Sequence, residues 1–284
     1  MYRRRYSFSM RPGADRGLAR LAACAAAAVL AALGTLAGAT AARADEVLVA
    51  VAANFRPPLQ EIATAFEAAS GHSVAISSGS TGQLYAQIVN AAPFDVFLAA
   101  DTERPALLAE AGLGEPQSVF TYATGQLALW SRDPGLVDPA TLERLGELEF
   151  RWLALAEPDV APYGTAARET LESLGLWSRL EPRLVRGQSI AQSFVMVATG
   201  NAELGFVALS QALTYEGEAS YAIVPQQRFA PIRQDAILLR RAADNPAARG
   251  LLEFLRGPVA AAIIGRYGYA VGPGADRPTE EARP

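Results

Sequence analysis

The sequence is poor in the residues that most catalytic and metal sites use. Its 284 residues include one cysteine (Cys24), one histidine (His72) and no lysine. One histidine and one cysteine cannot make the usual zinc ligand set, and a phosphate loop ending in Gly-Lys needs the missing lysine. The stretch "GSTG" is not a G-x-S-x-G nucleophile elbow, and His72 is expected to be a surface or packing residue. We therefore expect no enzyme, with a secreted hydrolase as a remote alternative.

The N-terminus has the order of segments found in an export signal. An arginine-rich start precedes a small-apolar run over residues 21–39, and Ala42-Arg43-Ala44 follows as an A-x-A cleavage site. This order predicts a signal peptide over residues 1–44, cleaved after Ala44, and a periplasmic mature chain that is not inserted in the membrane. The alternative is a membrane anchor, and Met10 is a possible second start. Cys24 leaves with the signal, so the mature chain needs no disulfide.

Basic residues are scarce once that segment is removed. Removing seven of the 25 basic residues and one of the 29 acidic residues leaves 18 against 28, a net charge of −10. Such an acidic surface argues against nucleic acid and against anionic membranes as partners. If the ligand is an anion, it must be bound by local features of the chain.

Strand and helix patterns alternate along the remaining chain. Near-continuous apolar strands at residues 46–53, 72–79 and 95–101 are separated by amphipathic helices, which indicates parallel sheets with both faces covered. The apolar stretch at 120–133 is interpreted as a crossing into a second lobe, where strands at 151–158, 183–188 and 204–210 follow. "SYAIVPQQ" and "RQDAILLRR" are interpreted as strands returning to the first lobe, which helices at 245–255 and 258–267 complete.

This alternation predicts a two-lobed α/β protein with a cleft between mainly parallel sheets. The expected boundaries are residues 45–122 for the first part of lobe 1, 123–225 for lobe 2, 226–273 for the return to lobe 1 and 274–284 for a disordered tail. Because the chain crosses out and back, the lobes are joined by at least two segments, so the cleft can close by hinge motion.

Four strand-to-helix turns are expected to meet at the cleft. They are Ala53-Asn54-Phe55, Ser80-Thr81-Gly82, Pro162-Tyr163-Gly164 and Gln188-Ser189-Ile190. Ligands of open parallel sheets bind outside the carboxyl ends of the strands, and each helix start offers free N–H groups and about half a positive charge. Four such starts could hold a compact dianion without any arginine.

Long stretches of the chain carry a resemblance to one family. From about residue 47 to residue 272, it resembles the periplasmic molybdate-binding proteins of ABC importers, in the type II periplasmic binding protein class and the branch with Asn in the first turn. The stretches are "AANF", "GHSVAISSGSTGQLYAQIVNAAPFDVFLAAD", "FTYATGQLALWS", "APYG" and "AELGFVALSQ". The resemblance implies a monomeric receptor without a cofactor, which binds molybdate or tungstate and passes it to a membrane permease.

The resemblance also implies the ligand-binding residues. Asn54 would donate through its amide and backbone N–H, Thr81 through its hydroxyl and backbone N–H, and Tyr163 and Ile190 through backbone N–H groups. Weaker candidates are Ala53, Ser80, Gly82 and Ser189, with Ser80 expected to cap its helix. No side chain would bind molybdenum directly.

Three positions depart from the family pattern. Ala53 stands where the nearest branch has a threonine, Thr81 replaces a serine, and Ala208 stands where another branch has a ligand-binding tyrosine. Sulfate and phosphate stay open as alternative cargoes, although protonated phosphate would need an acceptor, for which Glu157 and Asp159 are the nearest candidates. Ferric ion is disfavoured, because Tyr163 is isolated from other tyrosines and carboxylates.

Overall fold

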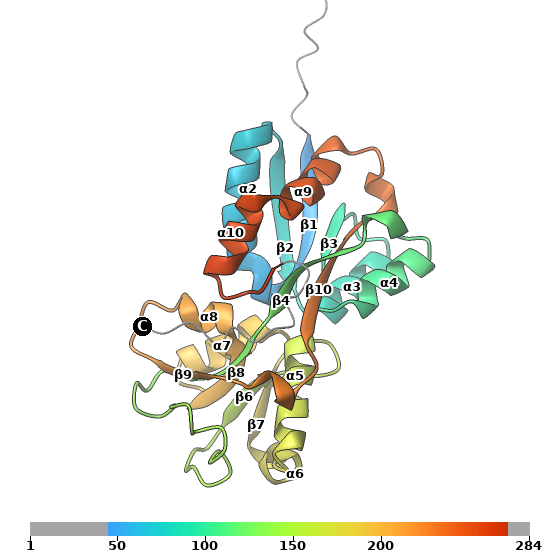
Figure 1. Cartoon of the computed structure of the whole chain (residues 1–284). Coiled ribbons are helices and arrows are strands. Elements are labelled where there is room, and N and C mark those ends of the chain that lie inside the picture. The colour runs from blue at the N-terminus through green and yellow to red at the C-terminus, as the bar shows by residue number, and fades with distance from the viewer. Residues whose placement is uncertain (1–44, 272–284) are drawn as a thin grey trace, which may run out of the picture. The chain divides into compact units, whose positions relative to one another are not determined.

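The computed structural model describes residues 45–271, in which two five-stranded sheets organise the chain (Figure 1). The predicted signal segment and the predicted tail lie outside the described residues. The first sheet has the order β2-β1-β3-β10-β4. It comprises β1 (Glu46–Ala52), β2 (Ser73–Gly79), β3 (Val96–Leu98), β4 (Phe120–Gly125) and β10 (Ile232–Leu238). Strands β2, β1 and β3 are parallel, and β10 runs antiparallel to both its neighbours.

Helices cover both faces of the first sheet, and we call this unit the first lobe. They are α2 (Arg56–Ser70), α3 (Thr81–Val89), α4 (Glu103–Glu110), α9 (Pro246–Arg256) and α10 (Pro258–Arg266), with the short 3-10 helices η1 (Ala53–Phe55), η2 (Pro116–Ser118) and η5 (Arg240–Ala242). In β1, Val47, Val49 and Val51 pack in the cluster that contains α2, α9 and α10, whereas Ala50 packs in the cluster that contains α3 and α4. Because successive residues of a strand face opposite sides, a strand covered on both sides is apolar throughout.

The second sheet has the same plan, and with its helices it forms the second lobe. Its order is β7-β6-β8-β5-β9. The strands are β5 (Leu127–Ser131), β6 (Leu153–Ala156), β7 (Leu184–Gly187), β8 (Leu204–Ala208) and β9 (Ser220–Ile223). The helices are α5 (Pro162–Ser173), α6 (Trp177–Leu180), α7 (Ile190–Ala198) and α8 (Leu209–Leu213), with η3 (Glu181–Arg183) and η4 (Gln226–Arg228). Helices α5 and α6 pack in one core cluster, which Ile190 at the start of α7 joins, while Val197 of α7 packs with α8 in another.

The chain passes between the two sheets twice. Only Gln126 separates β4 in the first sheet from β5 in the second, and residues 224–231 lead from β9 back to β10. Figure 1 shows β4 and β10, which are paired, where the chain passes between the sheets. The predicted two-lobed α/β fold is confirmed.

One expectation about the return path is wrong. "SYAIVPQQ" was expected to return to the first lobe, but its strand, β9, pairs with β5 at the edge of the second sheet. Exposed and buried residues alternate along β9, as in an edge strand with one face in solvent. Among residues 45–271, we find no helix with the length and apolar character needed to cross a membrane.

Candidate functional site

Residues from all four predicted turns line one small cavity at the carboxyl ends of the strands. The lining includes Ala53 and Asn54 after β1, Ser80 and Thr81 after β2, Tyr163 after β6 and Ile190 after β7. Water-sized spheres can occupy about 10 Å³ among these residues, which is about the space that one water molecule needs. The packed lobes therefore leave no space here for a drug-sized molecule.

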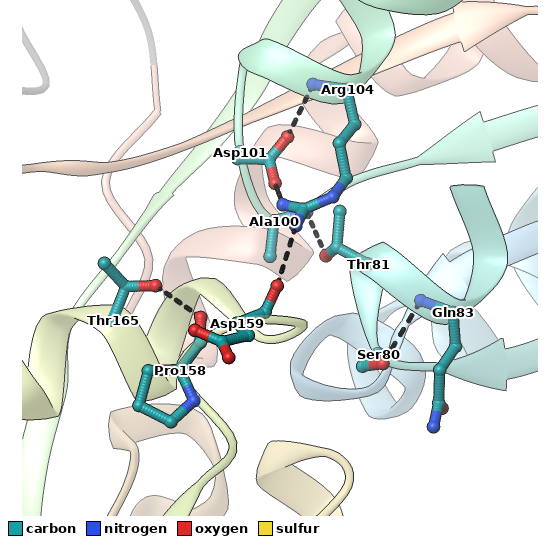
Figure 2. A network of polar contacts seen from close by, with 9 residues as sticks. All are labelled: Ser80, Thr81, Gln83, Ala100, Asp101, Arg104, Pro158, Asp159 and Thr165. Atoms are coloured by element: carbon teal, nitrogen blue, oxygen red, sulfur yellow. Dashed lines mark hydrogen bonds and ion pairs between the residues drawn. The ribbon is translucent and has the colours of Figure 1, made fainter. Parts of the chain in front are cut away.

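The polar groups at the start of α3 have different partners. The Ser80 hydroxyl accepts a hydrogen bond from the Gln83 N–H at 3.4 Å, which confirms the predicted cap. The Thr81 hydroxyl accepts from the Ala100 N–H at 3.0 Å (Figure 2). That bond leaves the hydroxyl proton of Thr81 to donate elsewhere. The Thr81 N–H lies in the first turn of α3, where N–H groups have no partner within the helix.

Gly82 does not have the position expected of a ligand donor. Its N–H donates to the Val160 carbonyl of the second lobe at 2.9 Å, and it is not among the residues that line the cavity. A Cβ at this position would lie 3.0 Å from the Val160 backbone. Gly82 therefore provides a close contact between the lobes.

Asn54 lies at the cavity, but its side chain is held by the protein. Its amide donates to Gln234 Oε1 at 2.9 Å and to the Tyr269 hydroxyl at 3.1 Å, and the residue is only 1% exposed. Both amide hydrogens are engaged in this arrangement, which differs from the expectation that the amide donates to a ligand. The backbone N–H of Asn54, in the first turn of η1, remains suited to that role.

The second lobe contributes the first turns of α5 and α7. Tyr163 is the second residue of α5 and Ile190 is the first of α7, so their N–H groups have no partner within their helices. Ser189 caps α7 by accepting from the Gln192 N–H at 3.4 Å and is not among the cavity residues. Gly164 lets α5 start against β6, because a Cβ there would lie 2.2 Å from the Ala156 carbonyl oxygen.

The cavity has a neutral lining. Among the described residues, none of those that line it carries a formal charge, so the positive ends of the helix starts decide its local field. Burial raises the pKa of Tyr163 well above its usual value, and the hydroxyl stays protonated at neutral pH. An anion here would meet N–H and O–H donors without a neutralising cation.

Direct contacts between the lobes surround the cavity. Besides the Gly82 contact, the Gln83 amide donates to Gln188 Oε1 at 3.2 Å. Arg104 forms an ion pair with Asp101 and donates to the Asp159 carbonyl across the cleft at 3.4 Å (Figure 2). These contacts join α3 and α4 to the turn before α5 and to the turn before α7. The structure thus shows the lobes closed on each other.

Comparison with known proteins agrees with this arrangement of turns. Residues 47–270 match the family described as "Bacterial extracellular solute-binding protein". The chain belongs to this family. This solute-binding protein is 48% identical over 228 residues to the molybdate-binding protein ModA of Rhodobacter capsulatus, which covers 80% of this chain and 89% of that protein.

Two further matches come from Azotobacter vinelandii. Its molybdate-binding protein ModA is 49% identical over 238 residues, with 82% of this chain and 93% of that protein covered. A solved structure of the periplasmic molybdate-binding protein from the same organism gives a TM-score of 0.75 at 39% identity, and covers 80% of this chain and 100% of that chain. The resemblance read from the sequence is confirmed.

Sequence reasoning missed the residues behind the cavity. Gln234 and Tyr269 both contact Asn54. Tyr122 contacts Gln234, and Ser210 contacts Tyr269. Gln211 donates to the Ile190 carbonyl at 3.4 Å. Each lies far from the four turns in sequence. Gln234 lies between Arg233 and Asp235 in β10, so the local pattern does not mark it as a buried residue.

Proposed function

We propose that this solute-binding protein is a periplasmic receptor for molybdate, and also for tungstate, that delivers the anion to the permease of an ABC importer. The observation that carries the proposal is the meeting of four helix starts from two lobes around one small, uncharged cavity. The names of relatives that are nearly half identical to this chain support molybdate as the ligand.

The binding mechanism rests on neutral donors. Asn54, Thr81, Tyr163 and Ile190 each present a backbone N–H, and Thr81 adds its hydroxyl. Because each helix start contributes about half a positive charge, four of them offset a doubly charged anion in a cavity without formal charges. Hydrogen bonds to a charged group contribute about 1.5–3 kcal/mol each, and this sum favours an anion that reaches all the donors at once.

Lobe closure follows from where these donors lie. Asn54 and Thr81 belong to the first lobe, whereas Tyr163 and Ile190 belong to the second. An anion that contacts all four binds the closed arrangement more tightly than the open one and shifts the population toward it. The closed receptor is then the form that we propose for docking on the permease.

The remaining parts of the proposal concern the exported chain. We infer that residues 1–44 are removed after Ala44, that the mature protein is monomeric, and that it needs no cofactor and catalyses no reaction. Molybdenum would enter only as the centre of its oxyanion, without direct protein ligands. Among residues 45–271, we find no group of three or more histidine, cysteine, aspartate and glutamate side chains that could hold a metal ion.

Calorimetric titration tests the ligand class. The full chain is expressed in a bacterial host, purified and titrated with molybdate, tungstate, sulfate and phosphate in phosphate-free buffer. We expect one-to-one binding of the first two anions and weak or no binding of the others. Preferential binding of sulfate would support an oxyanion site but refute molybdate as its ligand. No binding of any oxyanion would refute the whole proposal. The mass of the purified chain tests cleavage after Ala44.

A further inference from the structure

Asn54 is enclosed by a buried polar network drawn from both lobes. Besides Asn54, the network contains Tyr122, Gln234 and Tyr269 from the first lobe, and Tyr163 and Ser210 from the second. Asn54 is 1% exposed, Gln234 0% and Ser210 2%. Buried hydrogen bonds of this kind are costly to leave unmade, so the network constrains the turn that follows β1.

Gln234 links Asn54 to the second lobe on one side. Its Oε1 accepts from the Asn54 amide at 2.9 Å and from the Tyr122 hydroxyl at 3.1 Å. Its Nε2 donates to the Tyr163 hydroxyl of the second lobe at 3.3 Å. The amide of Gln234 therefore links Asn54 of the first lobe, through its oxygen, to the Tyr163 hydroxyl of the second lobe, through its nitrogen.

Tyr269 makes the corresponding link on the other side. Its hydroxyl donates to the Asn54 carbonyl at 2.8 Å and accepts from the Asn54 amide at 3.1 Å. The Ser210 hydroxyl, from α8 in the second lobe, lies 3.0 Å from the Tyr269 hydroxyl and donates to the Asn54 carbonyl at 3.3 Å. Asn54 is thus held through two routes, each of which ends on a second-lobe hydroxyl. The routes are linked, because the Tyr163 hydroxyl also hydrogen-bonds the Tyr269 hydroxyl.

A glycine at the end of β4 makes room for the first route. A Cβ at Gly125 would lie 2.0 Å from the Tyr163 hydroxyl and 2.6 Å from Gln234 Nε2. Real Cβ atoms do not approach other atoms so closely, so any larger residue would push Tyr163 out of the network. The backbone is built to let the second-lobe hydroxyl reach Gln234.

We propose that Gln234 and Tyr269 are positioning residues that transmit lobe closure to Asn54, an inference that rests on the proposed function. When the lobes separate, Tyr163 and Ser210 leave with the second lobe, and Gln234 and Tyr269 each lose a partner. The Asn54 turn then loses part of what fixes its N–H toward the cavity. Closure aligns the donor, and an anion bound to the aligned donor stabilises closure in return, because such coupling is reciprocal.

The test uses variants that remove one hydroxyl at a time. Tyr163→Phe deletes the end of the Gln234 route and keeps the Tyr163 N–H, and Ser210→Ala deletes the end of the Tyr269 route. Tyr122→Phe is the matched control, because that hydroxyl also contacts Gln234 but lies within the first lobe. We expect the first two to raise the molybdate dissociation rate about 2- to 10-fold, as the net loss of one hydrogen bond implies. The control should leave the rate within about twofold.

A Gln234→Leu background measures how much of the Tyr163 effect passes through Gln234. In that background Tyr163→Phe should have a smaller effect on the dissociation rate, because only the bond of its hydroxyl to Tyr269 is left to lose, whereas Ser210→Ala should keep its full effect. Urea unfolding of every variant reports any loss of stability separately. An equal effect of Tyr163→Phe with and without Gln234, or an effect of Tyr122→Phe as large as that of Tyr163→Phe, would overturn the proposal.

Hydrogen exchange gives a readout that needs no ligand. The Gly82 N–H donates to Val160 across the cleft, so its protection in the free protein reports closure. Tyr163→Phe and Ser210→Ala should lower that protection several-fold, and Tyr122→Phe should not. Unchanged protection in all three variants would refute the transmission of closure even if molybdate binds. Lowered protection in a protein that binds no oxyanion would instead refute only the proposed function.

Discussion

Replacing Thr81 by valine probes the candidate site with the least change of shape. The Thr81 hydroxyl accepts from the Ala100 N–H at 3.0 Å, and both residues are buried. Valine fills the same space without a hydroxyl, so the variant leaves a buried N–H without a partner at a cost of about 1–3 kcal/mol. Domains have stabilities of roughly 5–15 kcal/mol, so the variant should fold with lowered stability.

The effect on binding is separate from the effect on stability. If the hydroxyl proton of Thr81 donates to the anion, its loss removes one hydrogen bond to a charged group, about 1.5–3 kcal/mol. Since each 1.4 kcal/mol is a factor of ten, the dissociation constant for molybdate should rise about 10- to 150-fold. The backbone N–H of residue 81 remains, so binding should weaken rather than disappear.

Calorimetric titration and urea unfolding measure the two effects on the same samples. Thr81→Ser is the matched control, because it retains the hydroxyl and removes only a methyl group, and it should bind molybdate within a few-fold of the parent. A folded Thr81→Val variant with unchanged affinity would exclude the hydroxyl as a ligand donor. A Thr81→Ser variant as weak as Thr81→Val would show that the methyl group, not the hydroxyl, sets the affinity.

Three further predictions concern stability and pH. Gly164→Ala should lower the free energy of unfolding by about 1–3 kcal/mol through overpacking, because its Cβ would lie 2.2 Å from the Ala156 carbonyl oxygen. Gly265→Ala should raise the free energy of unfolding by about 0.5–1 kcal/mol, because Gly265 lies inside α10 and a Cβ there would have nothing within 4 Å. Thermal melts in which Gly164→Ala were the more stable of the two variants would contradict this packing argument. Burial raises the pKa of Tyr269 to about 12, so stability should fall as pH rises above about 10, where the unfolded chain loses tyrosine protons that the folded chain retains. In urea titrations between about pH 9 and 11, the free energy of unfolding should fall less with pH in Tyr269→Phe than in the parent. An equal fall in both proteins would contradict the role given to the Tyr269 hydroxyl.

Local pattern alone predicts most of the fold. The valines of β1 and the helical spacing of Leu59, Ile62 and Phe66 in α2 follow from the repeats of strand and helix, and Gly71 ends α2 with a φ of 75°. The return path was the exception. β9 and β10 are both short strands near the point where the chain returns. Only the pairing of β9 with β5 assigns β9 to the second sheet.

The four turns of the site could also be predicted, because a helix start has its free N–H groups wherever it lies. What those groups and their neighbours contact was decided by the tertiary structure. Asn54 meets Gln234, which lies 180 positions away, and Tyr269, which lies 215 positions away; Gly82 meets Val160 across the cleft. The sequence by itself determined the strands, the helices and the neutral character of the site, since these depend on neighbouring residues. Only the closed packing of two lobes decided which donors stay free for a ligand, because that depends on partners that no local spacing encodes.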